Sequence, residues 1–269
     1  MAYKLLALDI DGTIKSHSES ISDHTLSMIS KVQKAGVKVT LATGRMSGSA
    51  LAIAKELDIN SPIVSSQGAI IVSPSNGKCI WHKPLTPQMA LGALEALSNS
   101  QIEILLYLKD DVYTTKDTPW VRSYRKRNLG KLYFVDDLRN LANKSPTRIV
   151  AFGDENEIAK ISRRLNKFFK NRLHVTRSLP HFYEILNPHA GKKNALEWLC
   201  NISQIRQDET VAFGNGYNDI EMVSWAGMGV AITGSPPELL EVADVVAPPV
   251  DKNGLAVILS RLLDQNAFH

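Results

Sequence analysis

The spacing of hydrophobic residues predicts alternating strands and helices in the first quarter of the chain. Residues 3–10, YKLLALDI, form an apolar run that ends in an acid, as a buried strand does. Residues 22–36 carry apolar side chains at helical spacing, with Ser22 at the N-cap position and Gly36 past the end. Two further strands are expected over 37–44 and 61–68, with a helix over 47–57 between them. This alternation predicts a mostly parallel sheet with right-handed crossovers.

From about Ile70 the pattern changes to that of an α+β domain with antiparallel pairs. Residues 69–83 contain two strand-like runs around Pro74, Asn76 and Gly77, which predicts a hairpin. The pattern that follows predicts helices over 87–98 and 155–170, and strands over 102–108, 111–115, 147–153, 173–178 and 182–187.

After Pro188 the alternation returns. It predicts helices over 193–200, 219–226, 237–243 and 254–263, and strands over 209–215 and 228–233. The simplest reconstruction is a two-domain α/β protein. Residues 1–84 and 188–269 would form a Rossmann-like parallel-sheet core, and residues 85–187 an inserted α+β domain.

Two acids stand at the end of the first predicted strand. Asp9 closes the apolar run and Asp11 follows two residues later, in LALDIDGT. Ligands of open α/β sheets bind at the carboxyl ends of the strands, so both acids face the expected site. Carboxylates so close repel each other unless a divalent cation or a proton intervenes. This pattern suits a carboxylate nucleophile beside a general acid/base, although an Asp-Gly turn closing a strand would read the same way.

Two further segments offer groups for an anion. Thr43, Gly44 and Arg45 follow the next predicted strand, where a hydroxyl and an accessible backbone N–H form a small anion-binding corner. Lys192 and Lys193 begin a predicted helix, a position that disfavours cations unless an anion is bound there. The alternative for the segment at Thr43 is a plain strand-to-helix turn. The alternative for Lys192 and Lys193 is a solvated lysine pair.

The stretch AFGNGYNDIEM, residues 212–222, follows a strand and opens a helix. As a G-x-G-x-x-G dinucleotide fingerprint it fails, because Asp219 occupies the position of the last glycine. As a metal-binding loop it offers oxygen donors in Asn215, Asn218 and Asp219.

Together, D-x-D-G-T, T-G-R, a lysine at a helix start and G-N-x-x-N-D occur in the order found in the haloacid dehalogenase-like hydrolases. The chain resembles the Cof-type phosphatases of that superfamily, which carry a large α/β cap between the second and third motifs. The resemblance covers essentially the whole chain. It implies an Mg²⁺-dependent phosphatase acting on small phosphorylated metabolites, such as sugar phosphates, FMN or pyridoxal phosphate, through an aspartyl-phosphate.

The same resemblance assigns roles to residues. Asp9 would be the nucleophile and Asp11 the general acid/base, with Thr43 on the phosphoryl oxygens and Lys192 balancing charge. Mg²⁺ would be bound by Asp9, the backbone carbonyl of Asp11, Asn215 and Asp219. Gly12, Gly44, Arg45, Gln67 and Asn218 are the expected substrate-binding residues. Tyr107, His181 and Glu184 lie in cap strands that could face the cleft.

One position departs from the family pattern. The family has Asp where this chain has Asn215, so the predicted metal site loses one negative charge. An amide oxygen can still bind Mg²⁺, but Mg²⁺ favours carboxylate, so we expect weakened affinity. Two other functions stay open: a phosphomutase using the same aspartyl-phosphate, and a binding protein that has lost turnover.

Composition sets the remaining bounds. The net charge of +4 and the pI of about 8.9 describe a mildly basic chain and not the dense patch of a nucleic-acid binder. The five cations of 121–131 are read as a solvated face. Two cysteines without a motif are expected to be reduced, buried thiols. With no signal-like start and no membrane-length apolar run, the expectation is a cytoplasmic monomer or homodimer.

Overall fold

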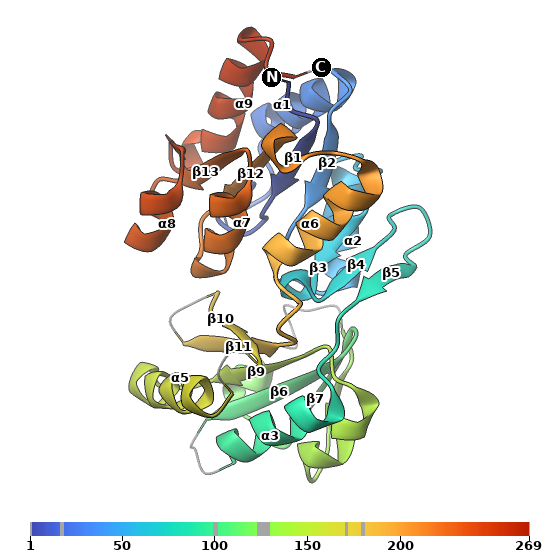
Figure 1. Ribbon diagram of the computed structural model, residues 1–269, viewed down its shortest axis with the longest axis vertical. Coiled ribbons are helices and arrows are strands. Elements are labelled where there is room, and N and C mark those ends of the chain that lie inside the picture. Colours follow the sequence, from blue (N-terminus) through green and yellow to red (C-terminus); the bar gives the residue numbers. More distant parts are fainter. Residues whose placement is uncertain are drawn as a thin grey trace.

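The computed structural model describes residues 2–16, 19–98, 102–122, 130–169, 172–178 and 181–268. Figure 1 shows two parts, one above the other, with both chain ends at the far end of the upper part. The chain passes from the upper part to the lower and returns.

The upper part is built on a parallel sheet of five strands in the order β14-β13-β12-β1-β2. All neighbouring pairs are parallel, and Leu8, the last residue of β1, lies between Leu41 and Phe213. The strands are β1 (Leu5–Leu8), β2 (Lys38–Leu41), β12 (Thr210–Gly214), β13 (Met228–Ile232) and β14 (Val245–Ala247). The predicted parallel core sheet is therefore confirmed.

Helices cover both faces of this sheet, because successive strand residues point to opposite sides. Leu6 and Leu8 pack in a cluster with side chains of α1, α2 and α9, whereas Ala7 packs with α6 and α7. The helices are α1 (Asp23–Lys34), α2 (Ser47–Glu56), α6 (Lys192–Ser203), α7 (Ile220–Trp225), α8 (Pro237–Val242) and α9 (Gly254–Asp264), with short 3₁₀ turns η3 (Gln207–Glu209), η4 (Tyr217–Asp219) and η5 (Val250–Lys252). The result is the three-layer arrangement expected of an α/β fold.

The third predicted strand behaves differently from the first two. β3 (Ile63–Ser65) makes one parallel bridge, from Val64 to Ala42, the residue that follows β2. It pairs antiparallel with β4 (Ile70–Val72). β4 in turn pairs with β5 (Cys79–His82), which confirms the predicted hairpin. β3 ends early because the 3₁₀ turn η1 (Ser66–Gly68) follows it, with left-handed backbone at Ser66 and Gln67.

The lower part, which we call the cap, is an antiparallel sheet with helices on one side (Figure 1). Its strand order is β10-β11-β9-β6-β7-β8, and only the pair β7–β8 is parallel. The strands are β6 (Glu103–Leu108), β7 (Asp111–Thr114), β8 (Leu132–Phe134), β9 (Arg148–Phe152), β10 (His174–Thr176) and β11 (Phe182–Leu186), with α3 (Pro87–Leu97), η2 (Leu138–Lys144) and α5 (Glu155–Phe169).

The two chain segments that connect the parts are joined to each other. Asn187 donates its side-chain N–H to the backbone carbonyl of Pro84 at 2.7 Å. These residues flank the predicted boundaries at 84/85 and 187/188, which stay a prediction.

Some sequence-based expectations need correction. β8 and β14 were not predicted, since their apolar stretches, LYF and VVA, are only three residues long. Cys200 is buried as expected, but Cys79 is exposed because it lies on the outer strand of the hairpin. Of the basic segment 121–131, residues 123–129 lie outside the described part. No helix within the described ranges combines the length and apolar character that a membrane span requires.

Candidate active site

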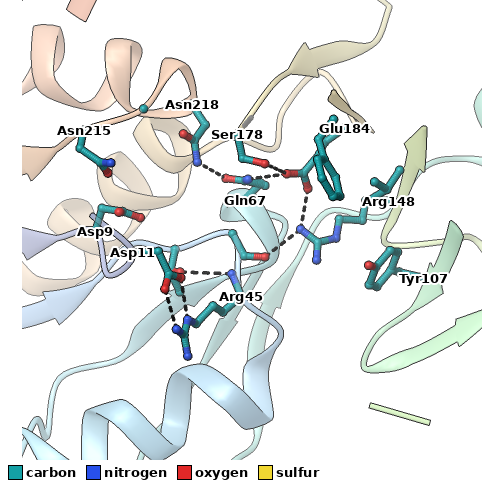
Figure 2. Close-up of a pocket in the computed structure, with 15 residues that line it drawn as sticks. Asp9, Asp11, Arg45, Gln67, Tyr107, Arg148, Ser178, Glu184, Asn215 and Asn218 are labelled. Carbon is teal, nitrogen blue, oxygen red and sulfur yellow. Dashed lines mark hydrogen bonds and ion pairs between the residues drawn. The ribbon is translucent and has the colours of Figure 1, made fainter. Parts of the chain in front are cut away.

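A pocket of about 230 Å³ lies where the carboxyl ends of the core strands meet the cap. Asp9, Asp11 and Thr43 line its core side, with the loop around Asn215 beside them. Tyr107, Val150, Phe182 and Glu184 line its cap side. Figure 2 shows how the labelled polar side chains converge on this space from both parts. A site shared by two parts can be reshaped when the parts move.

Lys192 joins two carboxylates at the bottom of the site. Its Nζ lies 2.6 Å from Asp9 Oδ1 and 2.6 Å from Asp219 Oδ1. The lysine side chain is 1% exposed, and the two carboxylates are 8% and 1% exposed. Because Lys192 is the first residue of α6, the two acids balance a cation at the positive end of a helix.

Burial and charge shift the pKa values of this group in defined directions. Burial raises the pKa of Asp9 to about 7, against the opposing effect of Lys192. Burial would lower the pKa of Lys192, but Asp219 and Asp9 outweigh it and the pKa is raised. Lys192 therefore stays a cation at neutral pH.

Asp11 is held by Arg45 through two hydrogen bonds. Arg45 Nε donates to Asp11 Oδ2 at 2.7 Å, and a terminal guanidinium nitrogen donates to Oδ1 at 2.6 Å (Figure 2). This side-by-side pairing is the strong geometry for Arg and carboxylate. It raises the pKa of Arg45. Both side chains are about a quarter exposed to solvent.

Backbone geometry brings the segments after β1 and β2 close to their neighbours. Gly12 has φ +90°, and a Cβ there would overlap the side-chain amide of Asn215. A Cβ on Gly44 would lie 2.5 Å from Gln67 Nε2. Thr43 is buried, and its Oγ1 accepts the N–H of Arg45 at 3.1 Å. Only glycine allows both close approaches.

The loop 214–219 uses its one carboxylate internally. Asp219 Oδ2 accepts the backbone N–H groups of Asn215 and Gly216, each at 2.9 Å. With Oδ1 on Lys192, both carboxylate oxygens have partners, and Asp219 is not among the pocket-lining residues. Asn215 does line the pocket, and its Oδ1 accepts the Thr13 hydroxyl at 3.1 Å.

A chain of hydrogen bonds links this loop to the cap. Asn218 donates to Gln67 Oε1 at 2.9 Å, and Gln67 Nε2 donates to Glu184 Oε1 at 2.6 Å (Figure 2). Glu184 also accepts from Arg148 at 2.7 Å and from Ser178 at 3.0 Å. The chain crosses the pocket between core and cap.

Comparison with known proteins decides the family. Residues 6–259 match the family model described as haloacid dehalogenase-like hydrolase. The chain belongs to this family. The predicted family, fold class and enzyme class are thereby confirmed.

Several relatives of this haloacid dehalogenase-like hydrolase match over nearly the full length. The Bacillus subtilis protein named "Putative phosphatase YkrA" is 29% identical, over 97% of this chain and 98% of its own. The HMP-PP phosphatase of an Enterobacter species is 26% identical, over 88% and 86%. The crystal structure of a haloacid dehalogenase-like hydrolase from Bacteroides thetaiotaomicron superposes with a TM-score of 0.83 at 25% identity, covering 97% and 99%.

The hydrolase brings most sequence-predicted site residues together. The pocket is lined by Asp9, Asp11, Thr43, Gly44, Arg45, Gln67, Asn215 and Asn218, and by Tyr107 and Glu184 from the cap. Lys192 lies behind Asp9. His181 is not among the lining residues and packs edge-on against Phe152. Lys193 points elsewhere and pairs with Glu197 on its own helix.

Sequence reasoning missed part of the cap side of the pocket. Arg148, Val150, Ser178 and Phe182 line it and were not singled out. Arg148 is 4% exposed, although it begins the apolar run RIVAF. A cation in an apolar strand is rarely buried without a partner, so this residue carried a usable signal. The other three carry no such mark.

The residues around Asn215 fit a small hard cation. A carboxylate oxygen of Asp9, the backbone carbonyl of Asp11 and Asn215 Oδ1 are oxygen donors of the kind that Mg²⁺ takes. Because the hydrogen bond from Thr13 uses one lone pair of Oδ1, the other is available. Among the residues described, no three His, Cys, Asp or Glu side chains form a metal-binding cluster.

Proposed function

We propose that this hydrolase is an Mg²⁺-dependent phosphatase that cleaves small phosphorylated metabolites through an aspartyl-phosphate on Asp9. One observation carries the proposal: a buried lysine holds Asp9 at 2.6 Å in a pocket that also contains Asp11 and Thr43. Phosphoryl transfer depends on positioning and on neutralisation of negative charge, which this set of groups supplies.

In the first step, an oxygen of Asp9 forms a bond to phosphorus and the bond to the leaving alkoxide breaks. Asp11 donates a proton to that alkoxide. In the second step, water attacks phosphorus, Asp11 accepts the proton of the water, and the bond from phosphorus to Asp9 breaks. Arg45 pairs with Asp11 through two hydrogen bonds and would position its carboxyl group for both proton transfers.

Asp9, the Asp11 carbonyl and Asn215 are the residues that would hold Mg²⁺. When bound, the cation would favour ionised Asp9 and neutralise charge on the phosphoryl oxygens. Asp219 has a different part in this proposal from the one expected at first. Its carboxylate positions Lys192 and the loop backbone, so it would act on the metal through Asn215.

The pocket supports a small leaving group. At about 230 Å³ it lies below the range of roughly 300–1,000 Å³ typical of sites for drug-sized ligands. A single phosphorylated ring agrees with this size better than FMN does. The HMP-PP phosphatase relative is an example of a family member named for a small phosphorylated compound. Cap residues 85–187 would select the substrate.

The cytoplasmic location and the monomeric or homodimeric state of the enzyme stay predictions from the sequence.

A phosphatase screen tests the proposal. Sugar phosphates, nucleotides and phosphorylated cofactors are incubated with the enzyme across a Mg²⁺ series, and released phosphate is measured. We expect Mg²⁺-dependent release, highest with single-ring substrates. Release that requires a bisphosphate activator would indicate a phosphomutase. No release from any substrate, p-nitrophenyl phosphate and acetyl phosphate included, would contradict the proposal.

The Asn215→Asp variant should need less Mg²⁺ than the wild type. The added carboxylate raises the charge of the donor set and keeps the acceptor for Thr13, so we expect the Mg²⁺ activation constant to fall by about tenfold. Calorimetric Mg²⁺ binding gives a second readout that does not depend on activity.

Asn218→Asp is the matched control, because it adds the same charge to the loop at a side chain that contacts Gln67. Peptide mass analysis must show an amide at position 215 in the wild type, since Asn-Gly sequences deamidate readily. Equal Mg²⁺ constants for Asn215→Asp and the wild type would refute the metal role of Asn215.

A further inference from the structure

The first turn of α2 is closed by a residue of the cap. Met46 occupies the N-cap position, and its side chain has no oxygen to accept the free N–H groups there. Asp110, in the turn between β6 and β7, takes that place. Its Oδ1 accepts the N–H of Ser47 at 3.0 Å and its Oδ2 accepts the N–H of Gly48 at 3.2 Å. These partners lie 63 and 62 residues apart in the chain.

Met46 itself is buried in the cap. It is 2% exposed and belongs to a cluster whose other buried members are Leu105, Tyr107, Val112, Val121 and Val150. All of these others are cap residues, so separation of cap and core would expose Met46 and free the amides of α2. We call the Asp110 hydrogen bonds and the Met46 packing together the α2 contact.

The α2 contact is adjacent to catalytic groups. Arg45 immediately precedes Met46, and its guanidinium donates both to Asp11 and to Ser49 Oγ in the first turn of α2, the latter at 3.2 Å. The backbone N–H of Arg45 donates to Thr43 Oγ1. The position of α2 therefore bears on Arg45, and through Arg45 on Asp11.

We propose that Asp110 is a positioning residue: by binding the α2 N-terminus it couples closure of the cap to placement of Arg45 and Asp11. This rests on the proposed phosphatase function. The charge suits the task, because a carboxylate is stabilised at a helix N-terminus and pairs with its N–H groups. The pocket wall formed by Tyr107 is brought in by the same movement, because Tyr107 packs with Met46.

The test compares Asp110→Ala with Asp111→Ala, which removes the neighbouring acid at the first position of β7 and leaves Asp110 in place. Hydrogen exchange of the Ser47 and Gly48 amides should accelerate in Asp110→Ala by about 2- to 30-fold, the range that follows from loss of a helix cap. The kcat/KM for the best substrate should fall by a similar factor, while Asp111→Ala matches the wild type in both measurements.

Asp110→Asn distinguishes positioning from mere stability. It keeps one acceptor oxygen and loses the charge, so exchange and kcat/KM should both lie between the wild type and Asp110→Ala. If Asp110→Ala does not fold, Asp110→Asn is compared with the wild type in its place. The proposal is overturned if the Asp110 variants keep the kcat/KM of an active wild type, whether or not their amide exchange changes. A wild type that hydrolyses no phosphate ester refutes the phosphatase function instead, and amide exchange still reports on the contact.

Discussion

Asp9→Asn should abolish phosphate release, lowering kcat by about 10⁴- to 10⁶-fold, the scale on which loss of a catalytic nucleophile acts. The amide is nearly the same shape and keeps an oxygen that accepts from Lys192, but it cannot form the phosphoryl bond at a useful rate. The other groups of the site remain, so substrate binding should change little. The measurement is phosphate release at saturating substrate and Mg²⁺.

Stability provides the control for Asp9→Asn. Burial raises the pKa of Asp9 to about 7, which means that the folded protein gains little from the ionised form. We therefore expect a thermal midpoint close to that of the wild type. Activity within tenfold of the wild type, in protein shown by mass to carry the amide, would exclude Asp9 as nucleophile.

Lys192→Met should lower both activity and stability. Removing one partner of a buried ion pair leaves uncompensated charge, here on Asp9 and Asp219, and costs about 3–5 kcal/mol of the free energy of unfolding. The loss of the cation beside the nucleophile should lower kcat/KM by about 10³-fold, the upper effect of removing one preorganised electrostatic group. Denaturant unfolding and steady-state kinetics measure the two effects.

Lys193→Met is the matched control for this variant. It removes the neighbouring lysine, whose partner Glu197 lies on an exposed helix face, and such pairs contribute about 0.3–0.5 kcal/mol. The prediction fails if the two methionine variants have similar unfolding free energies and similar kcat/KM values.

Much of the fold could be predicted because the core strands are continuous apolar runs. The runs that end at Leu8, Leu41 and Gly214 form parallel neighbours, so the polar residues that follow them share one edge. This adjacency brings together Asp9, Thr43 and the loop at Asn215, which had been joined from the sequence through the family resemblance. Lys192 and Lys193 were singled out because a helix start is unfavourable for a cation without an anion, and the resemblance chose Lys192.

The cap side of the site could not be predicted in the same way. Asp110 and Met46 acquire their partners only when the cap packs on the core, and no local pattern encodes a contact between residues 63 positions apart. Arg148 pairs with Glu184 on the neighbouring cap strand and reaches the core at the Gly44 carbonyl, contacts that its own segment does not show. Asp219 shows a related difficulty. Its residue type suits a metal ligand, but its two oxygens are taken by Lys192 and by two backbone N–H groups.

The most direct test of the account is detection of a phosphoryl group on Asp9. The Asp11→Asn variant is mixed with acetyl phosphate and Mg²⁺, quenched in acid and analysed by peptide mass. Acetyl phosphate has a leaving group that needs no proton, whereas hydrolysis of the intermediate needs the base that this variant lacks. The account predicts that phosphate accumulates on Asp9 and is absent from the Asp9→Asn/Asp11→Asn double variant. Phosphate on another residue, or phosphate release without any covalent intermediate, would contradict it.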